Sequence, residues 1–135
     1  MPNPLKTARG QSLAGLAIML PILLIILLGI IDFGRVFYAY VTITNASREG
    51  ARYGSMHPLS TEEIKSRVKQ EGAGTLTILD DDITVANDTE TVTVTVEITF
   101  TTLFFGNLPY IRDWLSGGAF PIRGQTAMPV LKALE

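Results

Sequence analysis

One uncharged stretch near the N-terminus constrains the fold of this chain more than any other feature. The 19 residues from Leu13 to Ile31 carry no charge, and they include seven leucines and six isoleucines. At about 1.5 Å per residue they form a helix of roughly 28 Å, which matches the roughly 30 Å hydrocarbon core of a bilayer. The sequence therefore predicts a single membrane-spanning helix, with the rest of the chain folded on one side.

The main alternative is a cleaved secretory signal. Such a signal has a shorter apolar core, of about 7–15 residues, followed by a small-x-small cleavage site. Here the apolar run is longer, and Asp32-Phe33-Gly34-Arg35 follows it. The pattern favours a retained membrane anchor.

Flanking charges predict the orientation. Lys6 and Arg9 precede the span without any acidic residue, whereas Asp32 and Arg35 after it nearly cancel. The positive-inside rule then places the N-terminus in the cytoplasm and the C-terminal part outside the cytoplasmic membrane. We expect a cytoplasmic tail over residues 1–11, a transmembrane helix over 12–32 and an extracytoplasmic domain over 33–135.

The composition argues against an enzyme. The net charge is −2 and there is no cysteine, which argues against nucleic-acid binding, thiol chemistry and thiolate metal sites. The single histidine, His57, has no companion ligands, and Asp80-Asp81-Asp82 lacks the ligand order of a calcium loop. We expect a solvated turn there, and no catalytic residue, metal, cofactor or small-molecule substrate.

The apolar helix is predicted to continue beyond the membrane, from Ser12 to Gly54. Apolar and small residues recur at positions 33, 37, 40, 44, 47 and 51, a spacing that marks one helical face. Phe33, Arg35, Phe37 and Tyr40 are expected to anchor the helix at the headgroup level. Ala46, Gly50 and Gly54 allow a close approach, either of this chain's own sheet, which we favour, or of a partner.

The remaining chain predicts one short helix and three strands. Ser60 and Glu63 have the spacing of a capping box for a helix from Thr61 to about Glu71. Alternating residues predict strands over 83–87, 91–100 and 120–130, with Pro129 typical of an edge strand. The expected fold class is α+β: a long N-terminal transmembrane helix that extends into a small outer domain with one short helix and a three-stranded antiparallel sheet.

Two sets of residues are candidates for partner contacts. Residues 100–114 hold five of the chain's eleven aromatic residues, and this stretch can fold onto the core, lie on the membrane or meet a partner. Within the span, two glycines and a proline allow close helix packing. The candidate contacts are Gly15, Pro21, Gly29, Phe104, Phe105, Tyr110 and Trp114.

Several motifs together resemble the TadE-like family. They are Arg9-Gly10-Gln11-Ser12-Leu13, Leu20-Pro21, the segment from Gly29 to Arg35, and the segment from Asn45 to Tyr53. This family consists of bacterial and archaeal pseudopilin-like proteins of tight-adherence (Flp-type) pilus systems. The resemblance implies an inner-membrane protein whose C-terminal domain lies outside, and processing by a prepilin-type peptidase after a glycine, for which Gly10 is the candidate. The family pattern has Glu at the fifth position after that glycine, but here it is Gly15.

Two functions remain open at this point. The first is a non-enzymatic accessory subunit of a larger inner-membrane complex, for example an energy-transducing one, held by lateral packing of the span and docking of the outer domain. The alternative is a pseudopilin-like component of Tad/Flp-type pilus assembly or secretion. In both, the partners are the lipid bilayer and other membrane proteins of a multi-subunit complex.

Overall fold

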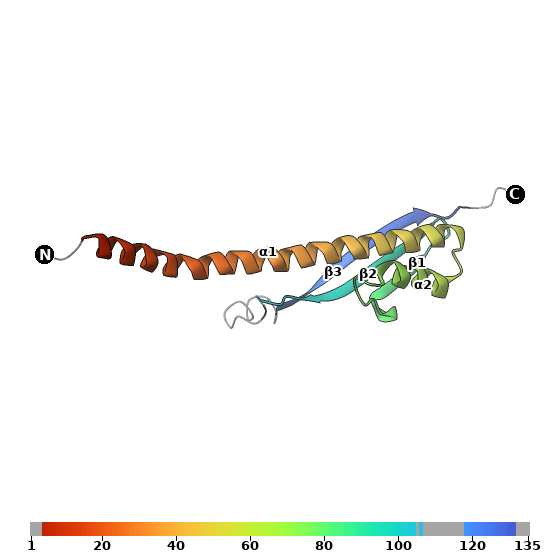
Figure 1. The fold of residues 1–135 in the computed structure, drawn as a ribbon. Coiled ribbons are helices and arrows are strands. Elements are labelled where there is room, and N and C mark those ends of the chain that lie inside the picture. Colours follow the sequence, from red (N-terminus) through yellow and green to blue (C-terminus); the bar gives the residue numbers. More distant parts are fainter. Residues whose placement is uncertain (1–3, 105, 107–117, 132–135) are drawn as a thin grey trace.

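A single long helix connects the two parts of the molecule. The computed structural model describes residues 4–104, 106 and 118–131, with side-chain surroundings from residue 13 onward. Helix α1 (Pro4–Met56) has 53 residues, which corresponds to about 80 Å. Its N-terminal half projects alone, and all other elements lie along its C-terminal half (Figure 1). The predicted continuous helix from Ser12 to Gly54 is confirmed.

The N-terminal half of α1 has the properties of a membrane span. It is long and apolar enough to cross a bilayer, with a mean hydropathy of 2.9 in its most apolar window. The side chains from Leu13 to Leu27 are all exposed, so no described residue of the protein covers them. The helix continues through Pro21 without a break. This part of α1 is therefore a candidate membrane-spanning helix.

Helix α2 (Thr61–Gly72) packs on the C-terminal end of α1, with Ile64 and Val68 fully buried as predicted. The predicted capping box is wrong, because the Ser60 side chain makes no capping hydrogen bond. The Glu63 carboxylate instead accepts a hydrogen bond from the hydroxyl of Tyr53 on α1. This carboxylate therefore ties α2 to α1 rather than closing the first turn of its own helix.

Three antiparallel strands follow a short 3-10 turn (Asp80–Asp82). They are β1 (Ile83–Asn87), β2 (Thr91–Thr101) and β3 (Ala119–Pro129), and their order in the sheet is β1-β2-β3. Because β2 is central, β3 is an edge strand, in agreement with Pro129 near its end. The predicted α+β fold class is confirmed, including the long apolar helix, the short helix and the three-stranded sheet.

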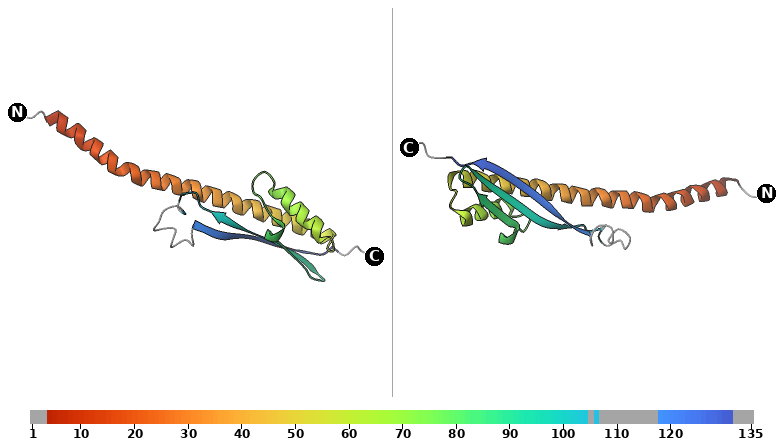
Figure 2. Two further views of the ribbon diagram at one scale, coloured as in Figure 1. Left: turned by 90° about the horizontal axis from the view of Figure 1, so that it is seen from below. Right: turned by 180° about the vertical axis from the view of Figure 1, so that it is seen from behind.

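The core lies where one face of the sheet meets α1 and α2 (Figure 2). The alternation in β2 places Val92, Val94 and Val96 on this inner face, where they are fully buried. The row of small residues on α1 packs here as well. A Cβ atom at Gly50 would lie 2.4 Å from a methyl carbon of Val68, and one at Gly54 would lie 2.7 Å from a methyl carbon of Val92. The small residues therefore serve this chain's own packing.

The face of α1 that the apolar spacing marks is buried only in its outer part, where Ser47 and Ala51 are fully buried. In the membrane-proximal part, the sheet covers a row that starts at Asp32 and continues through Ala39 and Ile43. The aromatic residues Phe33 and Phe37 lie outside this row and are 72% and 59% exposed. The sheet therefore packs on a neighbouring row that holds one carboxylate, one small residue and one large aliphatic residue, and it leaves the aromatic residues uncovered.

Strand β3 approaches the backbone of α1 closely at Gly124. A Cβ atom there would lie 3.0 Å from both the carbonyl carbon and the carbonyl oxygen of Ile43. These are backbone atoms, so the contact cannot be relieved by a side-chain rotation. The missing side chain at position 124 therefore sets the distance between the sheet and the helix.

We predict that Gly124→Val lowers the stability of the outer domain by about 1–3 kcal/mol, the usual cost of overpacking a tight contact. The measurement is urea unfolding of the full chain in detergent, followed by circular dichroism. Ala127→Val is the matched control, because Ala127 lies on the exposed face of the same strand. Equal unfolding midpoints for the two variants would contradict this packing account.

Candidate functional site at the junction of helix and sheet

Asp32 is the first charged residue after the apolar stretch, and it is almost completely buried, with 3% of its surface exposed. A buried carboxylate is costly unless it is paired and hydrogen-bonded. The contacts of Asp32 therefore show what holds the outer domain at this point on α1.

The Asp32 carboxylate binds the chain just after β2. Its Oδ1 accepts a hydrogen bond from the backbone N–H of Leu103, and its Oδ2 accepts one from Phe104, both at 3.1 Å. Arg35 places Nη1 3.6 Å from Oδ1, so these two charged residues form an ion pair. The two bonds from backbone N–H groups to the ionised carboxylate are charge-assisted, and such bonds are about twice as strong as neutral hydrogen bonds.

Arg35 connects the same carboxylate to the sheet. Its guanidinium carbon lies 5.0 Å from the centroid of the Phe100 ring, within the range of a cation–π contact. The ring of Phe100 in turn lies 5.8 Å from that of Phe120 on β3. One acid and one base on α1 therefore hold the end of β2 and the start of β3.

These contacts fix the depth of the β2 end relative to the apolar stretch. Leu103 and Phe104 are bound at the level of Asp32, directly after the last residue of the uncharged run. Figure 1 shows the corresponding ends of β2 and β3 turned back toward the N-terminal half of α1. Leu103 is 52% exposed beside this boundary. The predicted contact residues Phe105, Tyr110 and Trp114 lie outside the described residues.

The other predicted residues lie along α1. A Cβ atom at Gly15 would have nothing within 4 Å, so this position is open to a neighbour. Pro21 is exposed, and Gly29 is half-buried. Gly10, the candidate processing site, lies within the helix.

An exposed apolar stripe runs along the face of α1 that the sheet leaves uncovered. Its residues are spaced alternately four and three apart, so they share one side of the helix. At its N-terminal end, apolar side chains enclose a shallow hollow of about 210 Å³ on the helix surface. We name this set the apolar stripe; it consists of Met19, Leu23, Ile26, Ile30, Phe33, Phe37 and Tyr40, all exposed.

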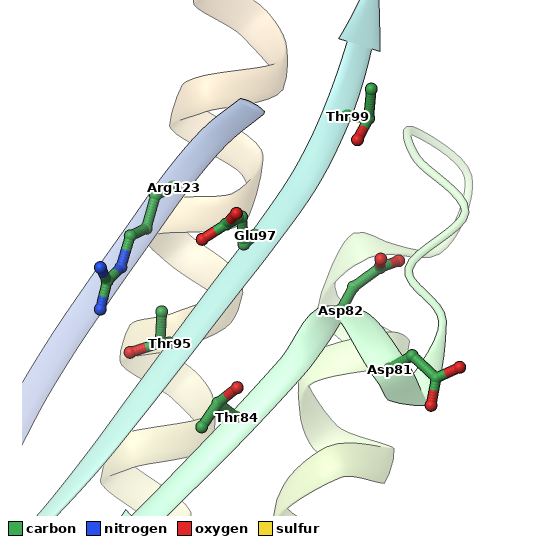
Figure 3. Close-up of a pocket in the computed structure, with 7 residues that line it drawn as sticks. All are labelled: Asp81, Asp82, Thr84, Thr95, Glu97, Thr99 and Arg123. Carbon is green, nitrogen blue, oxygen red and sulfur yellow. The ribbon is translucent and has the colours of Figure 1, made fainter. Parts of the chain in front are cut away.

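A polar hollow of about 480 Å³ lies on the outer face of the sheet, which points away from α1 (Figure 3). Its charged lining residues are Asp81, Asp82, Glu97 and Arg123. The neighbouring Asp80 lies 2.8 Å from Lys69 Nζ, and this hydrogen-bonded ammonium lowers the pKa of Asp80. Within the described ranges, no group of three or more side chains is placed to hold a metal ion.

Two features of the site were not predicted from the sequence, the backbone contacts of Asp32 and the polar hollow. An acid directly after a 19-residue uncharged run is a signal for the first, because a carboxylate at such a boundary needs partners. For the second, the signal is the row of polar residues at odd positions of the strand predicted over 91–100, together with Asp81 and Asp82.

We predict that Asp32→Ala destabilises the attachment of the β2 end by at least about 3 kcal/mol, because two charge-assisted hydrogen bonds of about 1.5–3 kcal/mol each are lost. Amide hydrogen exchange at Leu103 and Phe104 in the full chain measures this change. Arg35→Met is the control and is expected to cost less, since the Arg35 side chain is 41% exposed. Unchanged exchange at both amides in Asp32→Ala would refute the role of the carboxylate.

Comparison with known proteins gives one match. Residues 10–52 match the family model described as TadE-like protein. Among curated proteins and among solved structures, nothing matches the chain. The matched segment contains the apolar stretch, Asp32, Arg35 and most of the helix under the sheet. Residues 10–52 are therefore a TadE-like segment, in agreement with the resemblance seen in the sequence motifs.

Proposed function

We propose that this protein is a non-enzymatic, single-pass structural subunit of a larger membrane protein complex, of the kind that assembles Tad/Flp-type pili. The TadE-like match over residues 10–52 supports a pilus-associated membrane protein, and pilus-associated proteins of this family are typically structural. The span crosses the cytoplasmic membrane with its N-terminus in the cytoplasm, and the outer domain lies on the far side.

The apolar stripe is the observation that carries this proposal. Lipid covers its residues up to about Ile31, but Tyr40 lies nine residues further along the helix, or about 13 Å. The headgroup region on one side of a bilayer is only about 5–8 Å deep. Phe37 and Tyr40 are 59% and 48% exposed, so the outer end of the stripe needs a protein partner to leave water.

A second candidate is an accessory subunit of a different membrane complex, for example an energy-transducing one. Gly15 favours it, because the family resemblance implies Glu at that position, and in pilin-like packing that buried acid pairs with a neighbouring amino terminus. A charge inside the membrane is costly without its partner. With Gly15, the span is an uncharged anchor that packs sideways on neighbouring helices.

We predict that the double variant Phe37→Glu, Tyr40→Glu remains in the membrane but loses its partners. Buried aromatic anchors at interfaces contribute about 2 kcal/mol or more each, so recovery of copurifying proteins should fall at least about tenfold. The measurement is gentle detergent extraction followed by quantitative mass spectrometry. Asn45→Glu, an exposed position off the stripe, should leave recovery unchanged. Full recovery with the double variant would exclude the stripe as the contact surface.

The two candidate functions differ at the N-terminus and in the copurifying proteins. Assembly as a pseudopilin-like component predicts a mature protein that begins after Gly10, together with proteins of the pilus machine. An accessory subunit predicts that residues 1–10 are retained and that a multi-span complex copurifies at fixed stoichiometry. The intact mass of the protein, measured in the same preparation, separates them.

A further inference from the structure

The two outer strands cover the central strand unequally. Strand β3 pairs with β2 along all 11 residues, from Thr91 to Thr101. Strand β1 pairs only with residues 92–96, and its last partner pair is Ile83 with Val96. Among the described residues, no strand therefore pairs with the second half of β2, residues 97–101, on the β1 side.

Three hydrogen bonds show which way the backbone of β2 points. The N–H of Asp88 donates to the carbonyl of Thr91 at the β1 side, whereas the N–H of Thr102 donates to Gly118 at the β3 side. The N–H of Val130 likewise donates to the carbonyl of Glu90. Because backbone groups of alternate residues in a central strand face opposite neighbours, the odd-numbered residues of β2 face β1.

Thr99 and Thr101 therefore direct their N–H and C=O groups toward the uncovered side. If β1 were extended backwards in the same register, Asp80 would lie opposite Thr99 and Ile78 opposite Thr101. Neither residue is part of the sheet. Asp80 lies in the 3-10 turn, and Ile78 is buried against Gly72 of α2. An open strand edge with unpaired backbone groups is a template for another strand.

The other edge of the sheet is interrupted by two prolines. In β3, the residues whose backbone groups face outward are those opposite the odd residues of β2, including Pro121 and Pro129. Proline has no N–H, so it removes donors from this edge. Residues 97–101 contain no proline. Among the described residues, β3 therefore lacks two outward N–H donors, whereas the second half of β2 keeps all of its donors on the uncovered side.

The polar hollow on the outer face adjoins this open edge. Thr99 and Glu97 line it, together with Asp81 and Asp82 at the start of β1 (Figure 3). Its charged lining residues are three acids and one base, Arg123. Asp80 is already paired with Lys69, so it adds little to this charge. The surface beside the edge is therefore acidic.

We propose that the open edge of β2 at residues 97–101 binds an extended, basic segment of a partner protein. This segment pairs with β2 as a fourth strand, on the same side as β1 and beyond the point where β1 ends. Main-chain hydrogen bonds to Thr99 and Thr101 supply the pairing, and lysine or arginine side chains of the segment lie over the acidic hollow. The proposal deepens the proposed function, because it names the chemistry of one partner contact and rests on the protein being part of a complex.

A second copy of this chain cannot pair antiparallel with this edge. Strand β2 runs along α1 from the level of Ser55, where Leu131 is bound, to the level of Asp32. Antiparallel pairing of two identical β2 edges would turn one copy around, and its span would leave the complex on the opposite side. Two copies anchored in one bilayer cannot adopt that arrangement.

The first test is amide hydrogen exchange of the full chain in detergent micelles. Thr99 and Thr101 should exchange at least about tenfold faster than Ile98 and Phe100, whose N–H groups bind β3. Equal protection of all four amides at low protein concentration would overturn the open edge.

The second test adds a synthetic peptide of sequence Lys-Val-Lys-Val-Lys, with blocked ends. At saturation, exchange at Thr99 and Thr101 should slow severalfold, and the effect should weaken with salt. The matched peptide Glu-Val-Glu-Val-Glu should have little effect. Equal protection by both peptides would overturn the basic partner, and concentration-dependent protection without peptide would assign the edge to a second copy.

Two variants complete the test. Thr99→Pro removes one outward N–H without removing a bond to β3, and its direct partner, Pro121, shows that this sheet accepts proline at such a position. The basic peptide should then no longer protect Thr101. Glu97→Lys keeps the backbone and leaves two acids and two bases around the hollow, so the preference between the two peptides should disappear, whereas Glu90→Lys should leave it in place. Peptide protection that survives both Thr99→Pro and Glu97→Lys would refute the proposal.

These results are independent of the copurification experiment. The peptide assay uses the isolated protein, so a negative result removes the strand-addition site and leaves the structural subunit proposal intact. Loss of partners from the apolar-stripe variant with unchanged peptide binding would separate the two surfaces.

Discussion

The position of one buried carboxylate determines how the outer domain sits on its helix. Asp32 binds two successive backbone N–H groups after β2 and contacts Arg35. Without these partners, a charge directly after the apolar stretch would favour water. With them, it fixes the end of the sheet at the level where the uncharged run ends, and the close approach of Gly124 to Ile43 then sets the path of β3 along the helix.

Most of the fold was predictable, because its signals are local. The length of the uncharged run indicated the candidate span, and the alternation of valine and threonine indicated β2 and its buried face. The capping box failed because Glu63 binds a tyrosine on another helix, and spacing within one segment cannot reveal such a contact. The spacing marked one face of α1, but which part of that face is covered depends on where the sheet packs.

The candidate site was only partly predictable. The pair of Asp32 and Arg35 follows from its spacing, but its contacts with Leu103 and Phe104 join positions about 70 residues apart. The open edge of β2 depends on where β1 ends relative to its partner, and therefore on the register of the sheet. Phe33 and Phe37 were expected at the headgroup level; their exposure shows that the sheet leaves them free for lipid or a partner.

The direction of the sheet along α1 determines what faces the membrane and what faces away. The chain after β2 returns to the level of Asp32, while Leu131 is bound at the level of Ser55. These two levels are 23 residues apart on the helix, or about 35 Å. In the proposed membrane arrangement, a fluorescent label at Leu131 would therefore lie about 35 Å further from the lipid than one at Leu103.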